Sequence, residues 1–355
     1  MKTPPISIVK SVKFKAKPEA TTLGFGKYFT DHMFTAKYSV EKGWHQAEVG
    51  PYKSFEIDPG ASVLHYGQAL FEGMKAFKQE NEKVVLFRPE FNWHRMVAGA
   101  DRLCMEAPPK DLFLNGIKEL VKIDQEWIPD QPGSLYIRPT LVGTEAFLGV
   151  RPSNEMLFFA ILSPVSSYYA EGSAPVNIWV ETNYLRAAPG GLGATKAAAN
   201  YAVSLKAALD AKKKGYSQVL WLDFSREYIE EVGTMNVFFV FENEIVTPSL
   251  DGTILGGGVR HSVIQLLKLW NLPISERKLK LSEVLEASKN GKLKEAFGTG
   301  TAAVISPIGE LATESWKINL TNNGQQGELS KKIYDELTGV QYGRREDKLG
   351  WLQPL

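Results

Sequence analysis

The stretch Ala187-Ala-Pro-Gly-Gly-Leu-Gly-Ala-Thr-Lys196-Ala-Ala-Ala-Asn-Tyr201 sets one lysine among small residues. Three glycines and a row of alanines leave room beside the Lys196 amine for a bulky aldehyde cofactor. A lysine amine attacks a carbonyl only when it is unprotonated, so its solution pKa of about 10.4 must fall through burial or a neighbouring cation. The stretch therefore predicts an imine-forming lysine, the alternative being an exposed lysine at the start of a helix.

A second segment, Tyr228-Ile-Glu-Glu231-Val-Gly-Thr234-Met-Asn236-Val-Phe-Phe-Val240, places acidic and hydroxyl residues just before an apolar strand, and Gly298-Thr-Gly-Thr-Ala302 follows downstream. Together with Lys196 and Tyr201, these segments resemble the fold-type IV enzymes that use pyridoxal 5′-phosphate (PLP). The resemblance is greatest to the branched-chain amino acid aminotransferases of class IV.

This resemblance runs from about Phe25 to the stretch Gln341-Tyr-Gly-Arg344. Three further blocks resemble those of the family and occur in the same order: Tyr66-Gly-Gln-Ala-Leu-Phe-Glu-Gly-Met-Lys-Ala-Phe77, Phe87-Arg-Pro-Glu-Phe-Asn-Trp-His-Arg95-Met, and Leu135-Tyr136-Ile-Arg138-Pro. One position pair departs from some relatives, which carry Cys-x-x-Cys where this chain has Ala303 and Ser306. Thiol control of activity is therefore not expected.

The resemblance implies a PLP site in a cleft between two domains. It assigns the imine to Lys196 and the ring-nitrogen carboxylate to Glu231, for which Glu230 is the competing candidate. The remaining cofactor residues that it implies bind the ring phenolate or the phosphate: Tyr201, Arg95, Thr234, Gly258, Val259 and Thr301. The turn Ile254-Leu-Gly-Gly-Gly-Val-Arg260 precedes an apolar helix over His261–Trp270, whose amides and dipole favour an anion.

The resemblance also implies a reversible amino transfer between L-leucine, L-isoleucine or L-valine and 2-oxoglutarate, which gives branched-chain 2-oxo acids and L-glutamate. Lys196 forms the aldimine and, once released, serves as the general base, so the kinetics are expected to be ping-pong. The substrate residues that it implies form an aromatic box, a glutamate-side arginine and a carboxylate-binding turn: Phe25, Tyr66, Phe71, Tyr136, Val150, Tyr168, Arg138, Thr301 and Ala302.

Composition narrows the class of protein. Lys and Arg number 41 against 40 Asp and Glu, without the basic stripe that nucleic acid requires. The longest apolar runs, 156–162 and 237–241, are strand-sized and too short for a bilayer. The single cysteine, Cys104, is expected to be a buried small hydrophobe in a reducing compartment. We therefore expect a soluble cytoplasmic protein without nucleic-acid or membrane partners, and without a metal because the five histidines show no ligand spacing.

Mixed helices and strands predict an α/β or α+β fold in two domains. We predict a small α/β domain over 1–165, a linker rich in proline and serine over 166–178, and a large domain carrying Lys196 over 179–355. Helices are predicted over 91–103, 112–128 and 196–211, with Asn92 capping the first. In the third, Tyr201, Leu205, Ala208 and Leu209 are expected to form the apolar side. Strands are predicted over 83–88, 134–139, 176–180, 218–222 and 235–241.

Two rival functions share parts of this pattern. A D-amino acid aminotransferase or an aminodeoxychorismate lyase would also carry Lys196 and Glu231. A phosphate-ligand binding protein without catalysis would use Arg95 and the glycine turn but would not need Lys196. The resemblance finally implies a homodimer, because in the family a small-domain loop reaches the partner's active site, and Val150 with the 144–149 loop is expected to cross here.

Overall fold

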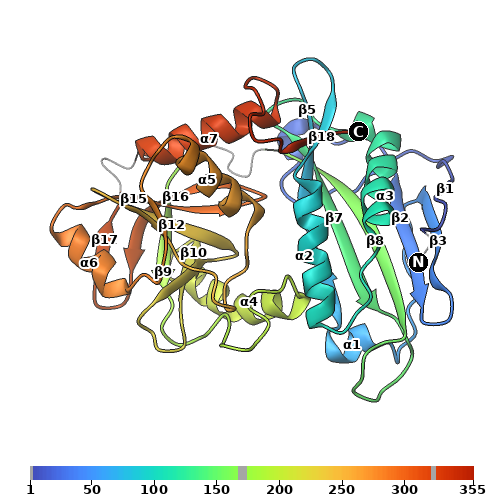
Figure 1. The fold of residues 1–355 in the computed structure, drawn as a ribbon, viewed down its shortest axis with the longest axis horizontal. Coiled ribbons are helices and arrows are strands. Elements are labelled where there is room, and N and C mark those ends of the chain that lie inside the picture. Colours follow the sequence, from blue (N-terminus) through green and yellow to red (C-terminus); the bar gives the residue numbers. More distant parts are fainter. Residues whose placement is uncertain (1–2, 167–173, 321–324) are drawn as a thin grey trace. The chain divides into compact units, whose positions relative to one another are not determined.

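The computed structural model describes residues 3–166, 174–320 and 325–355. Its residues divide into two compact units, which are coloured by sequence in Figure 1. The first unit comprises residues 3–166, Thr195–Ala199 and Gly339–Leu355, and the second comprises residues 174–194 and Asn200–Thr338. The first unit thus takes in two segments that the sequence analysis assigned to the C-terminal domain. They join it because Ala197 bridges to Leu70 and the C-terminal strand pairs with the strand Val84–Phe87.

The first unit is built on a nine-stranded sheet in the order β1-β3-β2-β8-β7-β5-β6-β18, with β4 paired to β7. All its pairings are antiparallel except that of β1 with β3. Its strands are β1 (Ser7–Ile8), β2 (His32–Ser39), β3 (Gly43–Pro51), β4 (Ala69–Phe71), β5 (Met74–Lys78), β6 (Val84–Phe87), β7 (Ser134–Gly143), β8 (Glu155–Val165) and β18 (Leu352–Pro354).

Among the described residues, the α-helices that lie wholly in this unit are α1 (Ser62–Tyr66), α2 (Pro89–Arg102) and α3 (Lys110–Ile123). Figure 1 shows α2 and α3 beside the sheet, where α3 contacts β2 and β3 and α2 contacts α3 and β4. The predicted helix over 112–128 is shorter in the structure, because α3 ends at Ile123 and a 3-10 turn, Gln125–Trp127, follows. Asn92 does not cap α2, since it lies inside the helix, buried, with its side-chain amide directed at Glu72.

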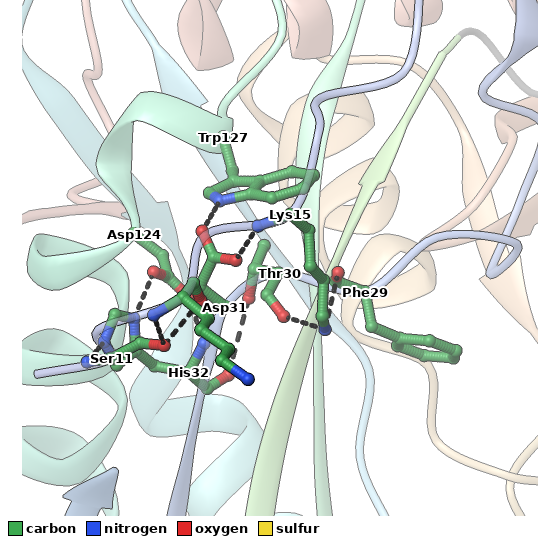
Figure 2. Close-up of polar contacts among 9 residues, drawn as sticks. Ser11, Lys15, Phe29, Thr30, Asp31, His32, Asp124 and Trp127 are labelled. Carbon is green, nitrogen blue, oxygen red and sulfur yellow. Dashed lines mark hydrogen bonds and ion pairs between the residues drawn. The ribbon is translucent and has the colours of Figure 1, made fainter. Parts of the chain in front are cut away.

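A buried polar cluster ties the N-terminal segment to this sheet (Figure 2). Ser11 N donates to His32 Nε2 at 2.9 Å, and His32 Nδ1 lies 2.6 Å from Asp124 Oδ1, so the ring proton sits on Nδ1. The Asp31 carboxylate accepts from Lys15 N and from Trp127 Nε1, each at 2.8 Å. Charged and neutral hydrogen bonds therefore help to hold the segment before β2.

The second unit contains a sheet that closes on itself. Its order is β11-β10-β9-β16-β15-β12-β13-β14, and β11 also pairs with β12, so six of the strands form a ring. β17 pairs with β16. The strands are β9 (Val176–Val180), β10 (Gln218–Leu222), β11 (Ile229–Val232), β12 (Met235–Phe241), β13 (Ile245–Thr247), β14 (Ile274–Glu276), β15 (Leu293–Gly300), β16 (Val304–Ala312) and β17 (Lys317–Asn319).

The helices α5 (Gly258–Leu269) and α6 (Leu281–Lys289) pack against β15, whereas α4 (Ala198–Lys213) and α7 (Glu328–Gln341) have residues in both units. The predicted apolar side of α4 is wrong, since Leu205 and Leu209 are 62% and 57% exposed. Ala207 and Ala211 are buried instead, against Val219 and Trp221. Small side chains allow the helix to approach this surface closely. Both units mix helices with strands, which confirms the predicted fold class.

Cys104 also departs from its prediction. It follows α2 in an exposed turn with a left-handed φ of +52°. The chain reverses there between α2 and α3, so the thiol faces solvent and not the core. Across the described ranges, every helix is too short or too polar to span a bilayer.

Candidate active site

Lys196 lies in a segment that the first unit holds by backbone pairing. Its carbonyl oxygen accepts from Phe71 N at 3.2 Å, and its Nζ lies 4.8 Å from the centroid of the Phe71 ring. α2 packs closely over this segment at Gly99, where an added Cβ would lie 3.1 Å from Leu70 and 3.4 Å from Thr195. The catalytic lysine predicted from sequence is therefore anchored beside an aromatic ring.

The same Phe71 ring also receives a guanidinium group. Arg138 lies 4.6 Å from its centroid and donates from Nη2 to the Tyr136 hydroxyl at 2.9 Å. Phe25 packs edge-on against Tyr136 at 4.8 Å between centroids. Burial raises the pKa of the Tyr136 phenol, so it stays protonated at neutral pH. Four of the predicted substrate residues thus lie together with Lys196, and they combine an amine, a cation that can bind a carboxylate, and aromatic rings.

Arg95 is positioned by a carboxylate that the sequence analysis did not single out. Its Nε and Nη2 donate to the two oxygens of Glu72 at 2.7 and 2.6 Å, a two-pronged ion pair. Asn92, one turn earlier on α2, donates to Glu72 Oε2 at 2.7 Å. Glu72 is 1% exposed and Arg95 is 13% exposed in its side chain. The arginine is therefore fixed in one orientation at the edge of the unit's interior.

The 144–151 loop carries Val150 and contacts Tyr66 of α1. A two-pronged ion pair between Arg151 and Glu145, at 2.7 and 2.9 Å, braces it. The Tyr66 hydroxyl donates to the carbonyl of Leu148. Val150 is 86% exposed, so within a single chain it does not pack with the residues around Phe71.

In the second unit, the turn before α5 packs against Asn236. Its amide donates to the carbonyl of Leu255 at 2.8 Å, and an added Cβ on Gly257 would overlap its Oδ1. β12 pairs antiparallel with β15 through Asn236 and Thr299, which brings the turns carrying Thr234 and Thr301 to the same end of the sheet. The N-terminus of α5, which begins at Gly258, is thereby placed beside these two turns.

This arrangement brings together the predicted hydroxyl, amide and turn residues of the second unit: Thr234, Gly258, Val259, Thr301 and Ala302. Gly257 at the N-cap has no side chain, and the helix N-terminus favours a negative ligand. The geometry can therefore receive a phosphate.

Glu231 is a buried carboxylate with two identified partners. Its Oε1 accepts from Leu255 N at 2.7 Å, and its Oε2 lies 3.0 Å from Arg186 Nε. Glu230, the competing candidate, points elsewhere on the same strand, since it lines a small cavity with Asp223 and Asp251. Burial raises the pKa of the Glu230 carboxyl.

Tyr201 lies half-buried on α4, five residues after Lys196, and Tyr168 lies outside the described residues. Three residues that the sequence analysis missed are Glu72, Arg186 and Asn236. Each of them contacts a predicted residue, or the turn that carries one, only in the folded chain. The residues next to them in the sequence do not indicate that role.

Each unit offers groups that fit PLP, the cofactor that the resemblance implies. The first offers an amine that can bind the aldehyde and an arginine that can bind the phosphate. The second offers a carboxylate that can pair with the ring nitrogen and a helix N-terminus that can receive the phosphate. The glycine at 257 leaves the approach to that helix open, where a side chain would overlap Asn236. Among the described residues, no group of three or more His, Cys, Asp or Glu could hold a metal ion.

Known proteins are similar to this chain over nearly its whole length. Branched-chain-amino-acid aminotransferase 2 of Bacillus subtilis is 52% identical over 339 residues, which cover 95% of this chain and 93% of that protein. The crystal structure of the Escherichia coli branched-chain amino acid aminotransferase has a TM-score of 0.75 at 25% identity and covers 91% of this chain and 98% of its own. The PLP form of the Thermobaculum terrenum branched-chain amino acid aminotransferase has a TM-score of 0.74 at 22% identity, covering 91% and 98%, and shows the shared fold.

The family profile described as amino-transferase class IV matches residues 69–311. That range includes most of the residues of both clusters, from Phe71 to Ala302. This chain belongs to the class IV aminotransferase family.

Proposed function

We propose that this protein is a PLP-dependent branched-chain amino acid aminotransferase. It transfers the amino group reversibly between L-leucine, L-isoleucine or L-valine and 2-oxoglutarate. The observation that carries the proposal is the Phe71 ring, which has the Lys196 amine at 4.8 Å and the Arg138 guanidinium at 4.6 Å. An amine that can form an imine and a cation that can bind a carboxylate thus share one aromatic wall, as a transaminase that uses glutamate requires.

The cofactor supplies an electron sink for the carbanion that forms when the substrate loses its α-proton. Lys196 would hold the cofactor, and its released Nζ would act as the general base that takes the substrate α-proton and gives it back. Glu231 would pair with the ring nitrogen, and Tyr201 would donate to the ring phenolate oxygen. Arg95, Gly258, Val259, Thr234 and Thr301 would bind the phosphate.

One pocket must accept both an apolar and an acidic side chain. The aromatic residues around Phe71, together with Tyr66 and Val150, offer apolar contact for leucine. Arg138 contacts Tyr136 and Phe71, so its guanidinium group keeps a hydrogen-bond partner in the pocket. It pairs with the side-chain carboxylate of glutamate when that substrate binds. The turn at Thr301 and Ala302 takes the α-carboxylate, and we assign Tyr168 to the aromatic box as well.

We also propose a homodimer in the cytoplasm. Phe147, Leu148 and Val150 expose 44%, 64% and 86% of their surface on a loop that the Arg151–Glu145 pair braces. Apolar side chains held rigidly in solvent are typical of a surface that another chain covers. Light scattering on the purified protein should give twice the mass of one chain, and a mass of one chain would refute the dimer.

The activity is tested by substrate choice. Purified protein reconstituted with PLP is incubated with L-leucine or with D-alanine, each with 2-oxoglutarate, and glutamate is measured. We expect glutamate from L-leucine and none from D-alanine, and no turnover from Lys196→Ala. Activity on D-alanine alone would refute the substrate assignment, and leucine activity in Lys196→Ala would refute the mechanism.

A further inference from the structure

Arg186 is a buried arginine at the centre of the second unit's cluster. It is 8% exposed and lies on the chain just before the lysine-bearing stretch. Its three nitrogens are all engaged within the second unit. Nε lies 3.0 Å from Glu231 Oε2, Nη1 donates to the carbonyl of Thr253 at 2.7 Å, and Nη2 donates to the carbonyl of Gly193 at 3.3 Å.

These contacts link three parts of the site. Gly193 belongs to the loop that leads to Lys196, and Thr253 belongs to the loop that leads to α5. Both loops approach closely, because an added Cβ on Gly193 would overlap the Thr253 carbonyl oxygen. Glu231, on β11, is the third partner. One guanidinium group therefore sets the position of the carboxylate relative to the two loops.

The charge of Arg186 has a second consequence for Glu231. Glu231 is 2% exposed, so water contributes little to stabilising its negative charge. A guanidinium at hydrogen-bonding distance favours the ionised carboxylate, and so does the Leu255 amide that donates to the other oxygen. When a carboxyl and a pyridine share one proton, whatever favours the carboxylate leaves that proton on the pyridine nitrogen.

We propose that Arg186 is a positioning residue that keeps Glu231 ionised and oriented, and so keeps the proton on the ring nitrogen of bound PLP. This inference rests on the proposed function. It goes beyond it because Arg186 acts through Glu231 and needs no contact with cofactor or substrate. The ring nitrogen must be protonated for the ring to accept electrons well, so the residue affects the chemical step more than substrate binding.

The experiment measures ring-nitrogen protonation directly. Full-length protein is loaded with PLP that is 15N-labelled in the ring, and the 15N chemical shift is recorded between pH 6 and pH 9. Two variants separate charge from structure. Arg186→Lys keeps a cation but loses the forked bonds to the carbonyls, whereas Arg186→Gln keeps an amide donor but loses the charge.

We expect a protonated ring nitrogen in the wild type and in Arg186→Lys, and an unprotonated one in Arg186→Gln. In Arg186→Gln, kcat for leucine should fall by about tenfold or more, as a change of one pKa unit would give, with KM changed much less. The matched control is Arg277→Gln, since Arg277 also bridges glutamates, Glu244 and Glu283, within the second unit. That variant should keep both the proton and kcat.

Three results would overturn the inference. A protonated ring nitrogen in Arg186→Gln, or loss of the proton in Arg186→Lys, would show that the charge of Arg186 does not set the protonation state. If Arg186→Gln does not fold, the Arg186→Lys result decides alone. A wild-type chain that binds no PLP would refute the proposed function as well, whereas the first two results leave that function standing.

Discussion

Lys75, on β5, offers a quantitative test of the first unit's interior. The residue is 7% exposed, and burial lowers its pKa from 10.5 to about 8. Because the ammonium form is more stable in the unfolded chain, the unfolded state binds more protons than the folded state between these two values. The cost of burying Lys75 is therefore fully present below pH 8 and disappears as the pH rises above 10.5.

The magnitude follows from the difference between the two pKa values. At 1.36 kcal/mol for each pKa unit, the cost is about 3 kcal/mol at pH 7 and about 1 kcal/mol at pH 10. Lys75→Met removes the titrating group but retains a long side chain. The wild type should thus gain about 2 kcal/mol in free energy of unfolding relative to Lys75→Met between pH 7 and pH 10.

The assay is urea unfolding of both proteins at pH 7, 8, 9 and 10, followed by circular dichroism and intrinsic fluorescence. The test is how the difference in free energy of unfolding between the two proteins changes with pH. Any loss of packing or hydrogen bonding in the variant adds the same amount to that difference at every pH. A stability difference that stays the same across this range would refute the argument, because Lys75 would then titrate alike in the folded and unfolded states.

Three further predictions concern the clusters. Glu72→Gln removes the ion-pair partner of Arg95, and the PLP dissociation constant should rise by about tenfold or more in a titration of the apoprotein; unchanged affinity would show that Arg95 needs no such support. Gly257→Ala adds a methyl group that would overlap Asn236, so PLP affinity should fall and the free energy of unfolding in urea should drop by about 1–3 kcal/mol. Wild-type behaviour in both assays would contradict the close approach of Gly257 to Asn236. Asp124→Asn weakens the hold on His32 and the N-terminal segment, which trypsin should then cut severalfold faster than in the wild type; equal cleavage rates would argue against this anchoring.

Strands rich in apolar residues could be predicted from sequence. The strands Val176–Val180, Gln218–Leu222 and Met235–Phe241 occur where the apolar runs predicted them. Such runs need no knowledge of the partner, because any packed interior accepts them.

The face of a helix is harder to predict than its existence. On α4, the leucines at 205 and 209 are exposed and the alanines are buried, since the close approach of Trp221 and Val219 decides which side packs. Hydrophobicity alone favours the opposite face. Cys104 is exposed for a related reason, because the turn after α2 directs it outward.

The residues of the candidate site also differ in how well the sequence predicts them. Lys196, Glu231 and Arg95 could be predicted as site residues from the residues beside them in the chain. Their supporting partners are not, since Glu72 lies 23 residues from Arg95 and Arg186 lies far from Glu231 in the chain. Only the folded chain shows that these charges meet.

The most direct test of the central claim is to find where the cofactor is attached. Purified protein loaded with PLP is reduced with borohydride, digested and analysed by mass spectrometry. Our account predicts a single pyridoxyl adduct, on the peptide that contains Lys196. An adduct on another lysine, or none, would contradict it.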